Sequence, residues 1–171
     1  GINKIIFFEP IQHNNEGLLK TLPQSEDIKT FNLALGPEKC ERKMYVETRN
    51  DGMSCSLLEP YKHLEMYPWI TFDSFETVQV EKLDNVPFER NFYNILNIDV
   101  QGYELQVLQG AIETLKHIDI IYSEVNAVEM YKGGALVNEL DNFLSDFGFK
   151  RVADNISNNG RWGDALYVNL Q

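Results

Sequence analysis

The chain is poor in cysteine and in basic residues, and it contains no long apolar run. Cys40 and Cys55 are its only cysteines and form no Cys-x-x-Cys pair, so neither a zinc site nor a disulfide framework is expected. Only 15 Lys and Arg stand against 26 Asp and Glu, which gives a formal net charge of -11. Such an acidic surface repels nucleic-acid phosphates, so we do not expect DNA or RNA binding. No apolar run approaches the ~20 residues of a membrane span.

The composition indicates a single globular domain. Of the 171 residues, 43% are apolar and 12% are aromatic, which is enough to build a hydrophobic core. No repeat, low-complexity tract or linker divides the chain, so we expect one domain over residues 1–171. The first residues show no signal-peptide pattern, and we expect a cytoplasmic protein.

The chain is organised around residues 94–110. Asn94–Ile98 has the pattern of a strand, Asp99 follows it, and Gly102 predicts a turn. The spacing of the next apolar residues predicts one amphipathic helix that carries Leu105, Leu108, Ile112 and Leu115. A strand, a turn and a helix make half of a βαβ unit, and in open α/β sheets ligands bind at the carboxyl ends of the strands. Asp99 therefore lies where a ligand is expected.

The rest of the chain alternates between strand and helix patterns, which indicates the α/β class. Strands are predicted at Lys4–Phe8, Ile28–Leu35, Lys43–Thr48, Thr77–Leu83, Ile118–Val125, Phe149–Ala153 and Ala165–Asn169. Helices are predicted around Leu18, Leu19 and Leu22, with Asn14 or Asn15 as the cap, and around Leu136, Leu140, Phe143, Leu144 and Phe147. The opening β-α-β spacing predicts parallel strands, whereas the short loop between the last two strands predicts an antiparallel pair.

Three phrases of the sequence resemble one known family. NIDVQGYELQVLQGA begins at Asn97, FFEP begins at Phe7 and YSEVN begins at Tyr122. Together they resemble the FkbM-type methyltransferases over a stretch from Ile6 to about Asn169. The resemblance implies a Rossmann-like class I methyltransferase fold, with a mostly parallel sheet that ends in an antiparallel hairpin. It also implies methyl transfer from S-adenosylmethionine to an oxygen, and we expect the substrate to be a small molecule or a glycan.

The resemblance implies that the cofactor contacts Glu9, Ala34, Leu35, Ser54, Ser56 and Asp99. A carboxylate such as Glu9 offers two acceptor oxygens to the vicinal diol of a ribose; otherwise it is a solvated group at a strand end. Ala34 and Leu35 end a strand against which an adenine ring can lie flat, or they simply end it. Ser54 and Ser56 face the cofactor pocket, or they cap a turn.

Asp99, Glu124 and Asn126 form the candidate catalytic group, because they end neighbouring predicted strands. Parallel neighbours lie about 5 Å apart, so their ends can converge. The three oxygen-bearing side chains suit Mg²⁺ beside a substrate hydroxyl. Alternatively, the Asp99 or Glu124 carboxylate takes the hydroxyl proton. In a purely structural interpretation, Asp99 orients the turn and Glu124 binds backbone amides. Glu104 lies in the first turn of the following helix, where we expect a structural role.

The family's fold normally starts with a strand and a glycine-rich loop, and no such segment precedes Ile5. We therefore expect the first strand and helix to be missing and the chain to belong to a longer domain. The absent strand would lie between Ile5–Phe8 and Ile95–Ile98, both of which have the pattern of buried strands. We expect an upstream segment or a second chain to complete the sheet. Otherwise the two strands pair directly, or Thr77–Leu83 fills the gap. Direct pairing would favour a non-catalytic methyltransferase-like module over an enzyme.

Other polar residues carry weaker signals. None of the three histidines, His13, His63 and His117, lies at a predicted strand end, so we expect surface or structural roles. Two loop pairs, Tyr131–Lys132 and Arg161–Trp162, either shape a substrate pocket or are ordinary loop residues.

Overall fold

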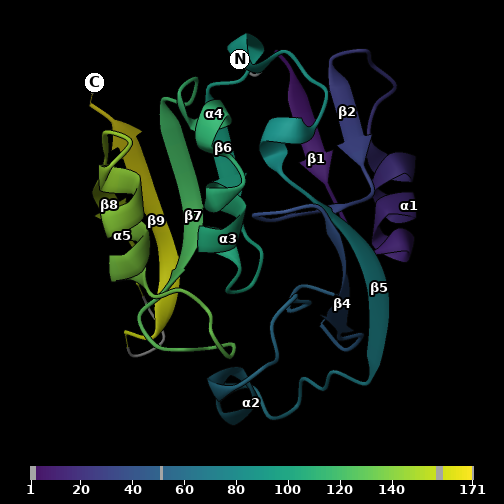
Figure 1. Cartoon of the computed structure of the whole chain (residues 1–171). Helices are drawn as coiled ribbons and strands as arrows, with labels where there is room; N and C mark the ends of the chain where they lie inside the picture. The colour runs from purple at the N-terminus through teal and green to yellow at the C-terminus, as the bar shows by residue number, and fades with distance from the viewer. Residues whose placement is uncertain (1–2, 51, 157–159, 171) are drawn as a thin grey trace.

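The computed structural model describes residues 3–50, 52–156 and 160–170. Strands and helices alternate along most of the chain, as predicted for the α/β class (Figure 1). The strands are β1 (Ile5–Phe8), β2 (Ile28–Phe31), β3 (Ala34–Leu35), β4 (Cys40–Val46), β5 (Ser74–Glu81), β6 (Ile95–Ile98), β7 (Ile120–Asn126), β8 (Phe149–Asp154) and β9 (Trp162–Asn169). The helices are α1 (Gln12–Thr21), α2 (Lys62–Met66), α3 (Glu104–Gln109), α4 (Ile112–Leu115) and α5 (Val137–Ser145), with the short 3-10 helices η1 (Leu83–Asn85) and η2 (Arg90–Phe92). Within the described residues, no helix has the length and apolar character to cross a membrane.

The strands form three sheets, in which parallel and antiparallel pairs are equally frequent. β1 pairs with β2, β5 lies between β3 and β4, and the third sheet has the order β6-β7-β9-β8. The pairs β1–β2, β3–β5 and β6–β7 are parallel, and β4–β5, β7–β9 and β8–β9 are antiparallel. The C-terminal antiparallel hairpin is confirmed, whereas the prediction of one mostly parallel sheet is wrong for the described residues. The reason is the long pairing between β4 and β5, which the spacing of strands along the chain does not reveal.

In the described part of the chain, β1 and β6 are not paired with each other. β1 pairs with β2 and β6 pairs with β7, and Figure 1 shows β1 and β6 apart. β5 pairs with β3 and β4, so it does not take the position between them. Of the three predicted arrangements, the described residues fit the one that leaves both edges open. Full burial of these strands is therefore wrong: β1 is only half-buried, and Ile95 of β6 is 54% exposed.

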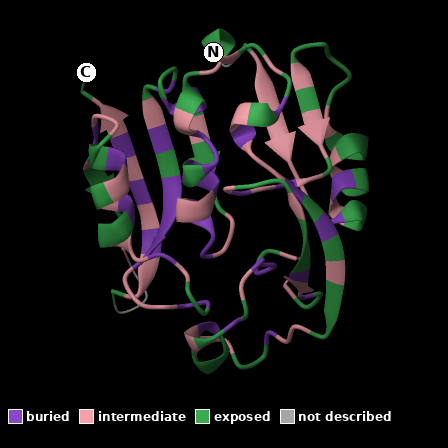
Figure 2. Cartoon of the chain, in the orientation of Figure 1, coloured by how far each residue is buried: buried purple, intermediate pink, exposed green. Residues whose placement is uncertain are grey.

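A large part of the core lies between the third sheet and the helices α3 and α5, and the same cluster continues to residues of β3, β4 and β5. Both helices pack against β7, and α5 also packs against β8. Figure 1 shows them on one side of this sheet, and Figure 2 shows buried positions along β7 and β9. An amphipathic helix buries its apolar stripe against a sheet in this way. The fully buried side chains include Leu108, Leu115, Ile121, Leu140 and Leu144.

One helix was predicted after Gly102, but the structure has two, α3 and α4, because the first helix ends at Gly110. Gly110 lies so close to the end of β3 that a Cβ on it would be 2.0 Å from the carbonyl oxygen of Gly36. The Gly110 carbonyl in turn accepts the N–H of Asp84 at 3.1 Å. The spacing of the apolar side chains continues across the break, so periodicity alone conceals it.

The single strand predicted at Ile28–Leu35 is also two elements, β2 and β3. The side-chain amide of Asn32 donates to the carbonyl oxygens of Glu9 and Pro10 at 2.9 and 3.0 Å. These bonds tie the residue between the strands to the end of β1. The chain therefore turns away from β1 and joins β5 instead.

Helix α1 begins earlier than predicted. It starts at Gln12, so Asn14 and Asn15 lie inside the helix and do not cap it. The carboxylate of Glu9 accepts the N–H of Ile11 at 2.8 Å, just before the first turn. A carboxylate at this end satisfies a backbone donor and suits the helix dipole. The role expected of an asparagine is thus partly taken by Glu9.

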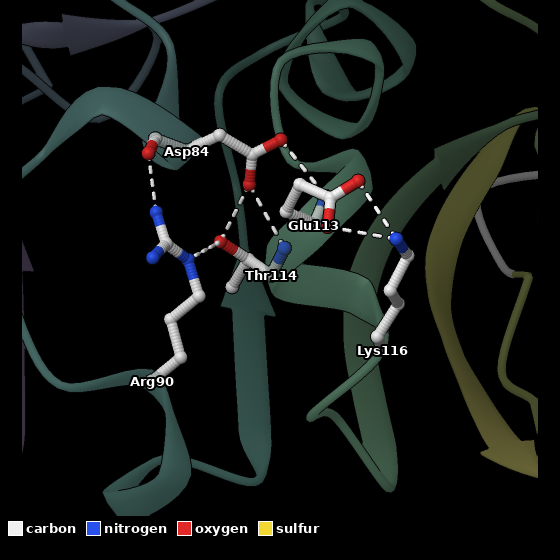
Figure 3. Close-up of polar contacts among 5 residues, drawn as sticks. All are labelled: Asp84, Arg90, Glu113, Thr114 and Lys116. Atoms are coloured by element: carbon white, nitrogen blue, oxygen red, sulfur yellow. Dashed lines mark hydrogen bonds and ion pairs between the residues drawn. The ribbon is translucent and has the colours of Figure 1, made fainter.

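Asp84 joins η1 to the start of α4 (Figure 3). Its carboxylate accepts the N–H groups of Glu113 and Thr114 at 2.9 and 2.8 Å and the Thr114 hydroxyl at 2.8 Å. Arg90 donates to the Asp84 carbonyl and to the Thr114 hydroxyl. These N–H groups have no partner within so short a helix, so the carboxylate satisfies them. Asp84 also donates its own backbone N–H to the carbonyl oxygen of Gly110. The residue that caps α4 therefore also bonds to the glycine at which α3 ends.

Gly110→Ala should lower the free energy of unfolding by more than about 2 kcal/mol, because its Cβ would meet a backbone oxygen. Gly17→Ala is the matched control, since nothing lies within 4 Å of its Cβ position. Alanine is the better helix former, so this control should stabilise the chain by about 0.5–1 kcal/mol. Urea unfolding of both variants measures the difference. Effects of equal sign and size would contradict the close contact.

Candidate functional site

Asp99 directly follows β6 and lies beside Glu124 of β7. β6 and β7 are parallel, and Ile98 pairs with Ser123, so the next residue of each strand follows at the same edge. The Gln101 amide lies between the two carboxyl groups, and its Nε2 donates to Asp99 Oδ1 and to Glu124 Oε2 at 2.7 Å each. The structure thus brings together the two residues expected to converge and adds an amide bridge between them.

The turn that carries Gln101 is held from both sides. Gln101 and Gly102 have φ angles of 55° and 95°, in the left-handed region that costs free energy for a residue other than glycine. Ser56 Oγ donates to the Gln101 carbonyl at 2.7 Å. Buried Glu104 accepts the N–H groups of Val100 and Gly102 at 3.2 and 3.0 Å, which agrees with a structural role. Burial raises the pKa of Glu104 to about 7, against the opposing effect of these bonds.

The two carboxyl groups of the pair differ in their exposure to solvent. Asp99 is exposed, whereas Glu124 is buried. Burial is the main cause that raises the pKa of Glu124 to about 9, and the charges of Asp99 and Glu104 act in the same direction. Glu124 is therefore the member of the pair that favours its protonated form.

Tyr131 links this pair to residues 54–63. Its hydroxyl lies 2.8 Å from Gln101 Oε1 and 3.1 Å from the Ser54 carbonyl oxygen, and it donates to these acceptors. The ring of His63 packs 5.4 Å from the Tyr131 ring, centroid to centroid, and its Nε2 lies 3.2 Å from Ser54 Oγ. Burial lowers the pKa of His63, so the ring is neutral at neutral pH. His63 thus packs against the ring of Tyr131, which agrees with the structural role expected of this histidine.

Asn126 ends β7 on the same face of the strand as Glu124. It is 3% exposed, and neither its amide nitrogen nor its carbonyl oxygen has a hydrogen-bond partner among the described residues. Buried amides are bonded in nearly all proteins. Asn126 therefore lies two residues from Glu124 and on the same face of β7, but it is not part of the hydrogen-bonded group.

Glu9 lies at the end of β1, apart from the carboxyl pair. Burial raises its pKa against the opposing hydrogen bond from Ile11. It borders a surface pocket that it shares with residues of α1, among them His13 and Asn14. Its charge also helps to raise the pKa of the buried Cys55 thiol, whose main cause is burial. Glu9 is thus within electrostatic range of the segment that carries both candidate serines.

The other candidate cofactor residues divide into two sets. Ala34 and Leu35 form β3, where they pair with β5 and pack against the core. Ser54 and Ser56 are buried, and they bond respectively to Tyr131 and to the Gln101 loop. The structure therefore joins the serines to the carboxyl pair and leaves Ala34 and Leu35 outside that hydrogen-bonded group.

The donor set does not support the predicted magnesium site. Among the described residues, no three His, Cys, Asp or Glu side chains are arranged to hold a metal ion. The N–H groups of Gln101 point into the space between Asp99 and Glu124, where a cation would have to lie.

Gln101 is the residue that the sequence analysis missed. It lies between an acidic strand end and a glycine, at the edge of the sheet where ligands bind, and that position is the available signal. Its left-handed backbone and the direction of its amide cannot be read from the residue type. Tyr131 was predicted only as one of several loop residues, because its contact with Gln101 joins segments 30 residues apart.

The chain is an α/β domain, and in open α/β sheets ligands bind at the carboxyl ends of the strands, the edge at which Asp99 and Glu124 converge. Comparison with known proteins identifies the family. The chain belongs to the FkbM methyltransferase domain family, which it matches over residues 1–151. It is 33% identical over 152 residues to the 2-O-methyltransferase NoeI of Sinorhizobium fredii (strain NBRC 101917 / NGR234), covering 84% of this chain and 62% of the relative. The chain thus spans less than two thirds of that relative's length. No solved structure matches it.

The stability of the chain should fall as the pH rises from 7 to 9. A pKa raised in the fold means that protonated Glu124 stabilises fully below its unfolded-state pKa and loses this effect as the pH rises through about 9. Glu104 loses its contribution earlier, around pH 7. The expected slope is up to about 1.4 kcal/mol per pH unit. Glu124→Gln, which mimics the protonated form, should remove it, whereas Glu26→Gln on the surface should not. Urea unfolding across this range is the measurement, and an unchanged slope in Glu124→Gln contradicts the assignment.

Proposed function

We propose that this chain is the catalytic part of an S-adenosylmethionine-dependent O-methyltransferase. The observation that carries the proposal is the Asp99–Glu124 pair, bridged by Gln101 where two parallel strands end, in a member of the FkbM methyltransferase family. Ligands of α/β sheets bind at this edge. The similarity to a 2-O-methyltransferase supports oxygen as the methyl acceptor.

Asp99 is the proposed general base. It is exposed at the end of β6, so it can accept the proton of an acceptor hydroxyl as the oxygen bonds to the methyl carbon. Glu124 keeps its own proton and does not compete for this one. Gln101 holds Asp99 in place through Oδ1. The cofactor, when bound, supplies a methyl group on a sulfonium that is already a good leaving group, so positioning by these residues accounts for most of the rate.

We assign the cofactor site to the side of the molecule that carries Glu9. Its half-buried carboxyl group borders an open pocket and suits a ribose diol. Ala34 and Leu35 are the proposed adenine contacts. Ser54 and Ser56 are further proposed cofactor contacts, and they bond to Tyr131 and Gln101 beside the carboxyl pair.

We further propose that the chain has a Rossmann-like class I methyltransferase fold. The order β6-β7-β9-β8 with β9 antiparallel supports this, as does the parallel pair β1–β2. The open edges of β1 and β6 would then receive a strand from an upstream segment or a second chain. The acceptor is a small-molecule or glycan hydroxyl in this proposal, and the cytoplasmic location stays a prediction from the sequence.

Glu9→Ala should weaken the binding of S-adenosylmethionine by ~1.5–3 kcal/mol, the range for hydrogen bonds to a charged group. Glu26→Ala removes an exposed carboxylate of the same charge and should leave the affinity unchanged. Calorimetric titration of the wild type and both variants measures this. If Glu9→Ala binds like the wild type, the ribose contact is wrong; if the wild type binds no cofactor, the chain is a non-catalytic module.

Asp99→Asn should lower kcat by about 10²–10⁴-fold with little change in KM, because it removes a general base and preserves the shape of the site. Asp146→Asn, an exposed residue after α5, serves as the control. Activity should persist in EDTA, since the amide of Gln101 occupies the space between the carboxyl groups. Loss of activity in EDTA that magnesium restores would reinstate the metal site.

A further inference from the structure

Tyr131 is a buried tyrosine whose hydroxyl faces the residue that bridges the carboxyl pair. It belongs to the loop between β7 and α5, yet it is only 1% exposed. Its hydroxyl lies 2.8 Å from Gln101 Oε1 and 3.1 Å from the Ser54 carbonyl oxygen. Both of these atoms are acceptors, so the hydroxyl is the donor in either bond. Burial is the main cause that raises the pKa of Tyr131, which keeps the hydroxyl protonated at neutral pH.

The ring of Tyr131 is held by its neighbours. It approaches the turn that carries Gln101 so closely that a Cβ on Gly102 would be 3.1 Å from its Cδ2. The ring of His63 packs 5.4 Å from it, centroid to centroid. The backbone that follows also bonds to the turn, because the N–H of Ala135 donates to the Gly102 carbonyl at 3.4 Å. The Tyr131 hydroxyl therefore has little freedom to move away from Gln101.

The bond from Tyr131 agrees with the direction of the Gln101 amide. A primary amide has an acceptor oxygen and a donor nitrogen, which point in different directions. The oxygen faces the Tyr131 hydroxyl, and the nitrogen donates to Asp99 Oδ1 and Glu124 Oε2 at 2.7 Å each. A reversed amide would place its oxygen against the Asp99 carboxylate, where neither atom is a donor. Gln101 is only half-buried, so without the bond from Tyr131 its side chain can turn toward solvent.

We propose that Tyr131 is a positioning residue: its hydroxyl holds the Gln101 amide between the two carboxyl groups, and the amide in turn holds Asp99. This inference rests on the proposed O-methyltransferase function and adds a residue that acts through Gln101. Ser56 fixes the backbone of the same residue through the Gln101 carbonyl at 2.7 Å, whereas Tyr131 fixes its side chain. A general base works only where it reaches the acceptor hydroxyl, so a misplaced Asp99 lowers the rate without weakening substrate binding.

A double-mutant cycle tests whether Tyr131 acts through Gln101. Tyr131→Phe keeps the ring and removes the hydroxyl, so it should lower kcat about 2- to 12-fold, the effect of one hydrogen bond, with KM unchanged. In the Gln101→Leu background it should not lower kcat further, because the amide that it holds is absent. Tyr167→Phe is the matched control: it removes a buried hydroxyl that bonds to Asp141 at 2.9 Å, and it should leave kcat unchanged. Equal effects of Tyr131→Phe in both backgrounds overturn the inference.

NMR of the Gln101 side-chain amide gives a second readout, which needs no turnover. Both carboxyl groups accept from this amide, so its hydrogens should exchange with water more slowly than those of the exposed Gln24. Tyr131→Phe should speed this exchange about 2- to 12-fold, whereas Tyr167→Phe should not. A wild-type amide that exchanges as fast as that of Gln24 overturns the inference, even if Tyr131→Phe does not fold. A slow Gln101 amide in a wild type without methyl transfer contradicts the proposed function and supports the hold of Tyr131 on the amide.

Discussion

The contact between Gly36 and Gly110 is the constraint on which the arrangement of the sheets depends. No side chain fits between these two backbones, because a Cβ on Gly110 would overlap the Gly36 carbonyl oxygen. The contact anchors the end of β3, and with it the β3-β5-β4 sheet, against the helices that cover the β6-β7-β9-β8 sheet. It also breaks the helix between α3 and α4 and leaves the Gly110 carbonyl to Asp84. One pair of glycines thus determines how the two halves of the chain meet.

The chemistry of the site follows from a difference in burial between two like groups. Asp99 and Glu124 share one amide donor, but one is exposed and the other is enclosed. Solvent can stabilise a negative charge on Asp99, whereas burial removes that stabilisation from Glu124. In the proposed mechanism, the pair of carboxyl groups therefore divides into a general base and a protonated hydrogen-bonding partner. Gln101 makes this possible, because its two N–H hydrogens bond to both groups.

Much of the fold and part of the site could be predicted from the sequence, for identifiable reasons. The strands at Ile95–Ile98 and Ile120–Asn126 carry strong local patterns, and acidic residues at their ends predict convergence. The break at Gly110 could not be predicted, because the apolar periodicity runs through it and its cause, Gly36, lies far away in the sequence. The partners of β5 were equally hidden, since pairing depends on the whole chain. The role of Gln101 was not predicted, because it depends on a left-handed backbone angle.

The open edges of β1 and β6 determine where water reaches the backbone. Alternate N–H groups of an edge strand point away from the sheet, and their hydrogens can exchange with solvent without any opening of the structure. The central strands β5, β7 and β9 have neighbours on both sides, so their amides exchange only when a larger part of the chain unfolds. Two outward rows of fast-exchanging amides therefore mark the boundary between the β1–β2 pair and the carboxyl site.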